Sequence, residues 1–166
     1  MKENPVSLKA TGIKYGLITA AICIVYFLVM DMAGLIHITA LRFFNYAFVL
    51  LGLFLAMNEV IHKQHTHRIN YLPGIALGFI IVFINAIIFS IFIFIYARFV
   101  DLNFVSLITP DLPPYNGTLN SYIIGVFTFS ESIMFGAVLS FIIMQYFKRN
   151  NSDSRLEASE EAAEWK

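Results

Sequence analysis

Long apolar stretches separated by short polar segments dominate the chain. The longest runs from Ile69 to Ala97 and contains no charged residue. As a helix with a rise of about 1.5 Å per residue it would measure roughly 43 Å, against about 30 Å for the hydrocarbon core of a bilayer. We therefore expect a membrane span here that is longer than it needs to be and that starts in the interface.

Three further apolar runs have the length of a membrane helix, and Glu131 alone interrupts the last of them. They are Tyr15 to Met30, Phe43 to Asn58, and Tyr122 to Phe147. Together the four runs predict transmembrane helices at about residues 13–35, 41–61, 72–98 and 121–147. The short link after the first run predicts a helical hairpin. The expected fold is all-α, an integral membrane bundle of four antiparallel transmembrane helices in one domain, residues 1–149.

The remaining segments are polar or rich in turn-forming residues. Pro110, Pro113, Pro114 and the pair Asn116-Gly117 predict a loop between the third and fourth spans. Residues 150–166 are polar and acidic, and we expect a disordered cytoplasmic tail. The first run is preceded by lysines, as a signal peptide would be, but Asp31 follows it instead of a small-residue cleavage site. We interpret it as a span.

Composition supports lipid as the main surrounding of the chain. Hydrophobic residues make up 58% of it and aromatic residues 16%, more than a soluble domain of this size can cover. Eleven basic and eleven acidic residues balance, so the basic footprint of a nucleic-acid-binding protein is absent. No nucleophile elbow, phosphate loop or metalloprotease motif occurs in the sequence. We expect a protein that is not an enzyme and that has no cofactor.

The positive charges predict the orientation in the membrane. If both termini are cytoplasmic, that side holds Lys2, Lys9, Lys14, Lys63, Arg68, Lys148 and Arg149. The opposite side then holds only Arg42 and Arg98. Cytoplasmic flanks carry the excess of lysine and arginine, so this orientation is the expected one.

Charged residues delimit three of the spans at a common spacing. The pairs Lys14 and Asp31, Arg42 and Glu59, and Glu131 and Lys148 are each seventeen residues apart. That spacing corresponds to about 26 Å of helix. It predicts that Asp31, Arg42 and Glu131 lie at one depth just inside the outer boundary, where Arg98 joins them. Because charges inside a membrane usually pair, we expect Asp31 to pair with Arg42, and Glu131 with Arg98.

This predicted outer charged ring has two interpretations. It can fix the register of the four helices, or it can form a site for a solute, ion or proton. Asn85 is the most central polar residue of the third span. We expect it to make an interhelical hydrogen bond, worth on the order of 1 kcal/mol in lipid, although a permeation site is the alternative.

Each span also carries two small residues four positions apart. They are Gly16 and Ala20, Gly52 and Ala56, Gly74 and Gly78, and Gly136 and Ser140. Small residues at this spacing let helix backbones approach closely. The pattern predicts a compact bundle, and it leaves open whether these positions pack within one chain or between copies.

A histidine-rich segment follows the second span. His62, His65 and His67 are side chains that could bind zinc or another transition metal. Lys63 and Arg68 would repel a cation there, and a hydrophilic cytoplasmic loop explains the same composition. We favour the loop.

Three short segments resemble a known family. They are Lys14-Tyr15-Gly16-Leu17-Ile18, Asn70-Tyr71-Leu72-Pro73-Gly74 and Tyr96-Ala97-Arg98-Phe99-Val100-Asp101. The chain resembles, over residues 8 to 149, an uncharacterised family of small four-span bacterial inner-membrane proteins catalogued as a domain of unknown function. The resemblance implies this topology and a location in the bacterial inner membrane. It implies no catalytic or binding residue.

These observations favour a non-enzymatic multi-pass membrane protein that acts through helix packing or partner contacts, as an accessory or structural subunit. The expected partners are the lipid bilayer and either further copies of the chain or another membrane protein. The alternative is a small oligomeric transporter or channel that uses the outer charged ring.

Overall fold

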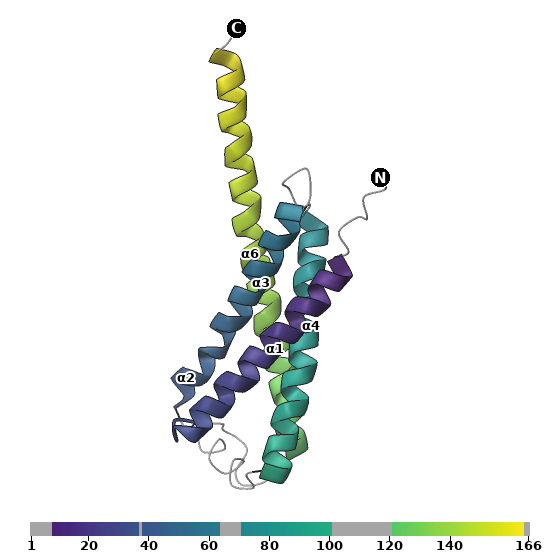
Figure 1. The fold of residues 1–166 in the computed structure, drawn as a ribbon, viewed down its shortest axis with the longest axis vertical. Helices are drawn as coiled ribbons and strands as arrows, with labels where there is room; N and C mark the ends of the chain where they lie inside the picture. Colours follow the sequence, from purple (N-terminus) through teal and green to yellow (C-terminus); the bar gives the residue numbers. More distant parts are fainter. Residues whose placement is uncertain (1–7, 37, 64–70, 101–120, 165–166) are drawn as a thin grey trace.

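The computed structural model describes residues 8–36, 38–63, 71–100 and 121–164, and for Thr39, Arg42 and residues 149–164 it describes the backbone alone. The regular elements in these ranges are helices, and none is a strand (Figure 1). They are α1 (Leu8–Met32), α2 (Thr39–Phe43), α3 (Asn45–Lys63), α4 (Tyr71–Ile95), η1 (Tyr96–Val100) and α6 (Ser121–Glu164). The predicted loop with Pro110, Pro113 and Pro114 lies outside the described residues.

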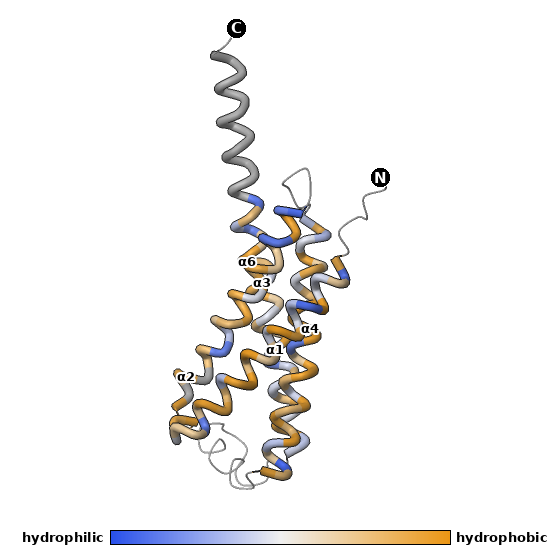
Figure 2. The backbone as a smooth tube through the Cα atoms, viewed as in Figure 1, coloured by the Kyte–Doolittle hydropathy of each residue, from blue (hydrophilic) through white to orange (hydrophobic). Residues whose placement is uncertain are grey.

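Four helical spans in the described part are long and apolar enough to cross a membrane, which confirms that prediction. They are Leu8–Met32, Asn45–Lys63, Tyr71–Val100 and Ser121–Lys148. The third is the longest, with 30 residues. Figure 2 shows hydrophobic colouring along most of each span. Even in the third span only 44% of the most apolar window is buried by the protein, so much of the apolar surface is left for lipid.

The second span begins later than residue 41. A break at Phe44 separates α2 from α3. The Leu41 carbonyl accepts hydrogen bonds from the Phe44 amide at 3.1 Å and from the Tyr26 hydroxyl at 2.9 Å. A break in an apolar helix is tolerated when its backbone groups find such partners. The side chain of Tyr26 therefore lets the chain bend at this point.

Gly34 ends the first span. Its φ of 67° is left-handed, a conformation that glycine adopts without a steric penalty. The Gly34 amide donates to the Asp31 carbonyl at 2.9 Å, and the Leu35 amide to the Met30 carbonyl at 3.0 Å. These two hydrogen bonds form a Schellman motif, which satisfies the last carbonyl groups of α1.

The tail differs from the expectation. The sequence predicts disorder for residues 150–166, whereas α6 continues as a helix through Glu164 (Figure 1). The last two residues lie outside the described part. The physical reason lies in the sequence: no glycine or proline follows Gly136, and alanine, glutamate, leucine and arginine favour a helix.

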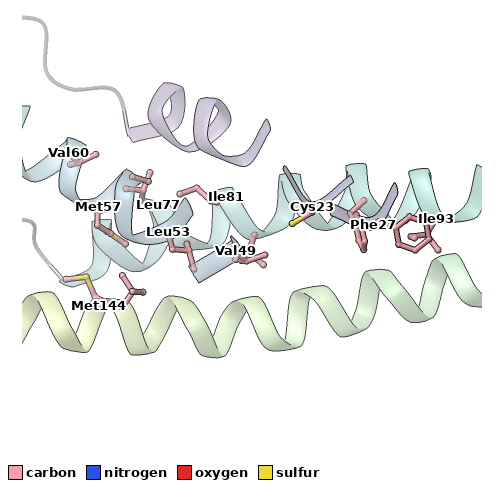
Figure 3. Packing of buried hydrophobic residues seen from close by; sticks show 14 of the residues in the cluster. Cys23, Phe27, Val49, Leu53, Met57, Val60, Leu77, Ile81, Ile93 and Met144 are labelled. Carbon is pink, nitrogen blue, oxygen red and sulfur yellow. The ribbon is translucent and has the colours of Figure 1, made fainter. Parts of the chain in front are cut away.

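Apolar side chains from all four spans form the core. Figure 3 shows Cys23 and Phe27 of α1, Leu53 and Met57 of α3, Leu77 and Ile81 of α4, and Met144 of α6 converging between the helices. The ring of Phe27 meets those of Phe89, Phe92 and Tyr96 edge to face, with centroids 6.4, 5.5 and 5.1 Å apart. Such rings are packed at favourable angles.

All eight small residues of the predicted pairs are buried within the single chain. They are Gly16, Ala20, Gly52, Ala56, Gly74, Gly78, Gly136 and Ser140. A β-carbon added at Gly16 would lie 2.9 Å from Ile84 Cβ, and one added at Gly78 would lie 2.5 Å from the Ser140 hydroxyl. The small residues therefore pack helices of the same chain together. This favours packing within one chain over packing between copies.

Candidate functional site

Contacts between α4 and α6 show which part of the third span lies beside Glu131, and so how deep Glu131 lies in the membrane. Going along α6, Ser121 Oγ donates to the Ala97 carbonyl at 3.3 Å, Gly125 faces Phe94, Gly136 faces Val82, and Ser140 faces Gly78. The contact positions run in opposite order along the two helices. Glu131 lies between Gly125 and Gly136, so its neighbours on α4 are near Ile87. That is the middle of the third span, two residues from Asn85.

This depth separates Glu131 from Arg98, its predicted partner in the outer charged ring, whereas Phe43, next to Arg42, contacts Phe135 one turn after Glu131. Arg98 follows Ala97, which lies opposite Ser121, and Glu131 comes ten residues after Ser121. Ten residues of helix measure about 15 Å. No ion pair joins Arg98 and Glu131, both of which belong to the described part. The equal spacing of charges therefore does not place Glu131 beside Arg98, because Glu131 lies ten residues inside a span that begins at Ser121.

Asp31 and Arg98 do lie near the same end of the bundle. The Phe27 ring contacts that of Tyr96, and Asp31 follows Phe27 by one turn. Asp31 is half-buried, while Arg98 is exposed in the π-helical segment η1. The side chain of Arg42 lies outside the described residues, so its predicted pairing with Asp31 stays a prediction.

Asn85 lies in the closely packed centre of the bundle. Its side chain is 4% exposed, and its amide oxygen accepts no hydrogen bond from the described residues. The hydroxyl oxygen of Thr19, packed against Gly52, is likewise buried without such a partner. The interhelical hydrogen bond expected of Asn85 is therefore not made through this oxygen, and close packing holds the centre together.

Glu131 is the most unusual residue at this depth. It is half-buried, and no hydrogen bond or ion pair to its carboxylate occurs in the part of the chain that the structure describes. A charged side chain near the centre of a bilayer costs about 2.5–3.5 kcal/mol on insertion scales. A positively charged or hydrogen-bonding partner from outside the described residues would therefore stabilise the Glu131 carboxylate in the membrane.

At the opposite end of the bundle, Glu59 forms an ion-pair cluster that the sequence analysis missed. Its carboxylate lies 2.9 Å from Lys14 Nζ and also contacts Lys63, one turn further along α3. The Glu59 side chain is only 16% exposed, against 54% for Lys14. The sequence did indicate this contact, because Lys14 and Glu59 stand at the same end of the predicted first hairpin.

Aromatic side chains extend this charged end. Lys14 Nζ lies 5.1 Å from the centroid of the Tyr15 ring, and Lys148 Nζ lies 5.5 Å from that of Tyr71. Gln145 Nε2 also donates to the Tyr71 hydroxyl at 3.5 Å. Tyrosines prefer the membrane interface, so this cluster is suited to a position at the level of the lipid headgroups.

The histidine alternative is only partly covered by the structure. His62 is exposed at the end of α3, whereas His65 and His67 lie outside the described residues. Within the described ranges, no three histidine, cysteine, aspartate or glutamate side chains come together as metal ligands would. A metal site that uses His65 and His67 stays untested.

The fold and the apolar surface define a four-span α-helical membrane protein. A family described as "Protein of unknown function (DUF4199)" matches residues 14–112. The match covers more than half of the chain and includes all three segments on which the resemblance rests, so the protein belongs to this family. No curated protein and no solved structure matches the chain.

Proposed function

We propose that the protein is a non-enzymatic, multi-pass membrane protein that acts through helix packing and contacts with a partner membrane protein, as an accessory or structural subunit. The observation that carries this proposal is the close contact between helices at glycine. A β-carbon at Gly12, Gly16 or Gly78 would come within 3 Å of a side chain of the neighbouring helix. Helices this close leave little space for a water-filled path through one protomer.

The surface of α6 supports a role in partner contacts. Only 22% of its most apolar membrane window is buried by the rest of the chain, the lowest value among the four described spans. A second helix can therefore pack along α6 without displacing any of the elements that the structure describes. Small residues occupy the contacts of α6 with α4, so the free side is formed by larger side chains.

We further propose that both termini are cytoplasmic and that the membrane is the bacterial inner membrane. Lys14, Lys63 and Lys148 stand at one end of the spans, and Arg98 stands at the other. The excess of basic residues marks the cytoplasmic side. The family resemblance is the basis for the bacterial inner membrane.

Purification from native membranes in a mild detergent tests the proposed role. We expect one membrane protein to copurify in a constant molar ratio through two chromatographic steps. An unrelated four-span protein with the same tag is the control. Vesicles that contain the purified chain should release protons, sodium and potassium no faster than vesicles without protein do. Ion flux by the chain alone would refute the proposal and favour the transporter alternative.

A further inference from the structure

We propose that Glu131 and the adjoining free face of α6 bind a transmembrane helix of another protein that carries a lysine or arginine near the middle of the bilayer. This inference rests on the proposed function and names the chemistry of the partner.

The surroundings of Glu131 place it at the edge of a free surface. Four residues further along α6, Phe135 packs against the rings of Tyr46 and Phe43, with centroids 4.8 and 6.1 Å apart. Phe127 and Val138, one turn before and two turns after Glu131, are 47% and 53% exposed. Residues at these spacings share one side of a helix. Glu131 therefore lies where the contact with α3 gives way to the lipid-facing side.

Among the side chains that the structure describes, none supplies a positive charge at this depth. From Ile69 to Ala97 the third span has no charged residue. On α1 the charged residues are Lys9, Lys14 and Asp31, and on α3 they are Glu59 and Lys63, all near helix ends. Arg42 of α2 adjoins Phe43, which contacts Phe135, but its side chain lies outside the described residues. Among the described side chains, Glu59 takes both ion pairs.

Charge complementarity then selects the partner. A carboxylate in hydrocarbon is stabilised by an opposite charge or by hydrogen-bond donors. An apolar helix with a central lysine or arginine supplies both, and the exposed apolar side chains beside Glu131 provide its packing surface. A second copy of the chain would bring another Glu131 to the same depth, and like charges repel.

A designed helix in vesicles tests the inference directly. The probe is a synthetic helix of about twenty leucine and alanine residues with one central lysine, and energy transfer reports its association with the full chain in phosphatidylcholine vesicles. We expect about tenfold tighter association than for the same helix with leucine at that position. In Glu131→Gln the preference should fall to within about twofold. Ser130→Ala, an exposed neighbouring position, should retain it.

Several results would overturn the proposal. Equal association of the lysine and leucine helices with the wild-type chain is one, and a preference that survives in Glu131→Gln is another. If a lysine preference arises only in Arg42→Gln, then Arg42 is the partner of Glu131. Association between copies of the chain that is lost in Glu131→Gln, without any added helix, would identify a second copy as the occupant.

The variants must be folded for these comparisons. Glu131→Gln removes a charge from the hydrocarbon and should keep the helical content of the wild type, measured by circular dichroism. Glu131→Asp retains the charge and should retain part of the lysine preference. If a partner copurifies in constant ratio while the lysine helix is not preferred, this inference alone fails. Ion flux by the chain alone would instead refute the proposed function.

Discussion

Replacement of Gly52 by alanine tests the close contact between α1 and α3. The added β-carbon would overlap the Thr19 hydroxyl oxygen. Thr19 is β-branched and lies within a helix, so few rotamers are available to it. Overpacking of this kind costs about 1–3 kcal/mol. Alanine gains up to about 1 kcal/mol over glycine in helix propensity. Because the new atom would overlap the hydroxyl oxygen, we take the upper end of the overpacking cost, and the expected net loss in the free energy of unfolding is about 2 kcal/mol.

The same substitution in a Thr19→Ala background gives the sharper measurement. Without the hydroxyl and methyl groups, the nearest remaining atom is the β-carbon of residue 19, at 3.3 Å from the new one. Gly52→Ala should then be neutral, or stabilising by up to about 1 kcal/mol. The coupling energy of the double-mutant cycle is therefore about 2 kcal/mol.

Unfolding by sodium dodecyl sulfate in mixed micelles, followed by far-ultraviolet circular dichroism, provides the free energies. Gly125→Ala is the matched control, because its added β-carbon would approach Phe94 only to 3.2 Å. It should change stability by no more than about 0.5 kcal/mol. A Gly52→Ala cost equal to that of Gly125→Ala would refute the reasoning. A cost that stays unchanged in the Thr19→Ala background would refute it too.

Three further substitutions test other parts of the fold by the same unfolding measurement. Glu59→Gln should cost about 0.5–1 kcal/mol at low salt and less at 1 M salt, because its ion pair with Lys14 is partly exposed; a salt-independent cost would contradict this. Gly34→Ala should cost about 1 kcal/mol because φ is positive there, and no loss would mean that the turn readjusts. Phe27→Ala should cost about 3 kcal/mol through lost core packing, while Phe99→Ala, 75% exposed, should stay within about 0.5 kcal/mol.

The length of the apolar runs was sufficient to predict the spans, and the spacing of small residues was sufficient to predict their contact positions. Composition decides these features locally, because about twenty apolar residues suffice to cross a bilayer. Sequence spacing could not identify the partner of each glycine. Gly52 meets Thr19 and Gly136 meets Val82, and both contacts depend on the register between helices.

The candidate site was predicted less well, and Glu131 shows why. Its spacing from Lys148 equals that between Lys14 and Asp31, so a common depth looked reasonable. Equal spacing within separate helices gives a common depth only if the helices are aligned, however, and Glu131 lies well inside a span that begins at Ser121, as predicted. The Glu59 cluster shows a related limit of equal spacing: Lys14 and Glu59 mark the ends of two different spans, and their contact depends on how those spans meet across the hairpin.

The continuity of α6 has a mechanical consequence. Its 44 residues correspond to about 66 Å of helix, roughly twice the thickness of the hydrocarbon core. No glycine or proline follows Gly136, so the part of α6 beyond that residue lacks the proline or glycine at which helices often kink. A rotation or tilt of the fourth span against α4 would be carried along this rod, and a small movement at its base would sweep the far end through several ångströms. The orientation of residues 149–164 therefore follows that of the fourth span.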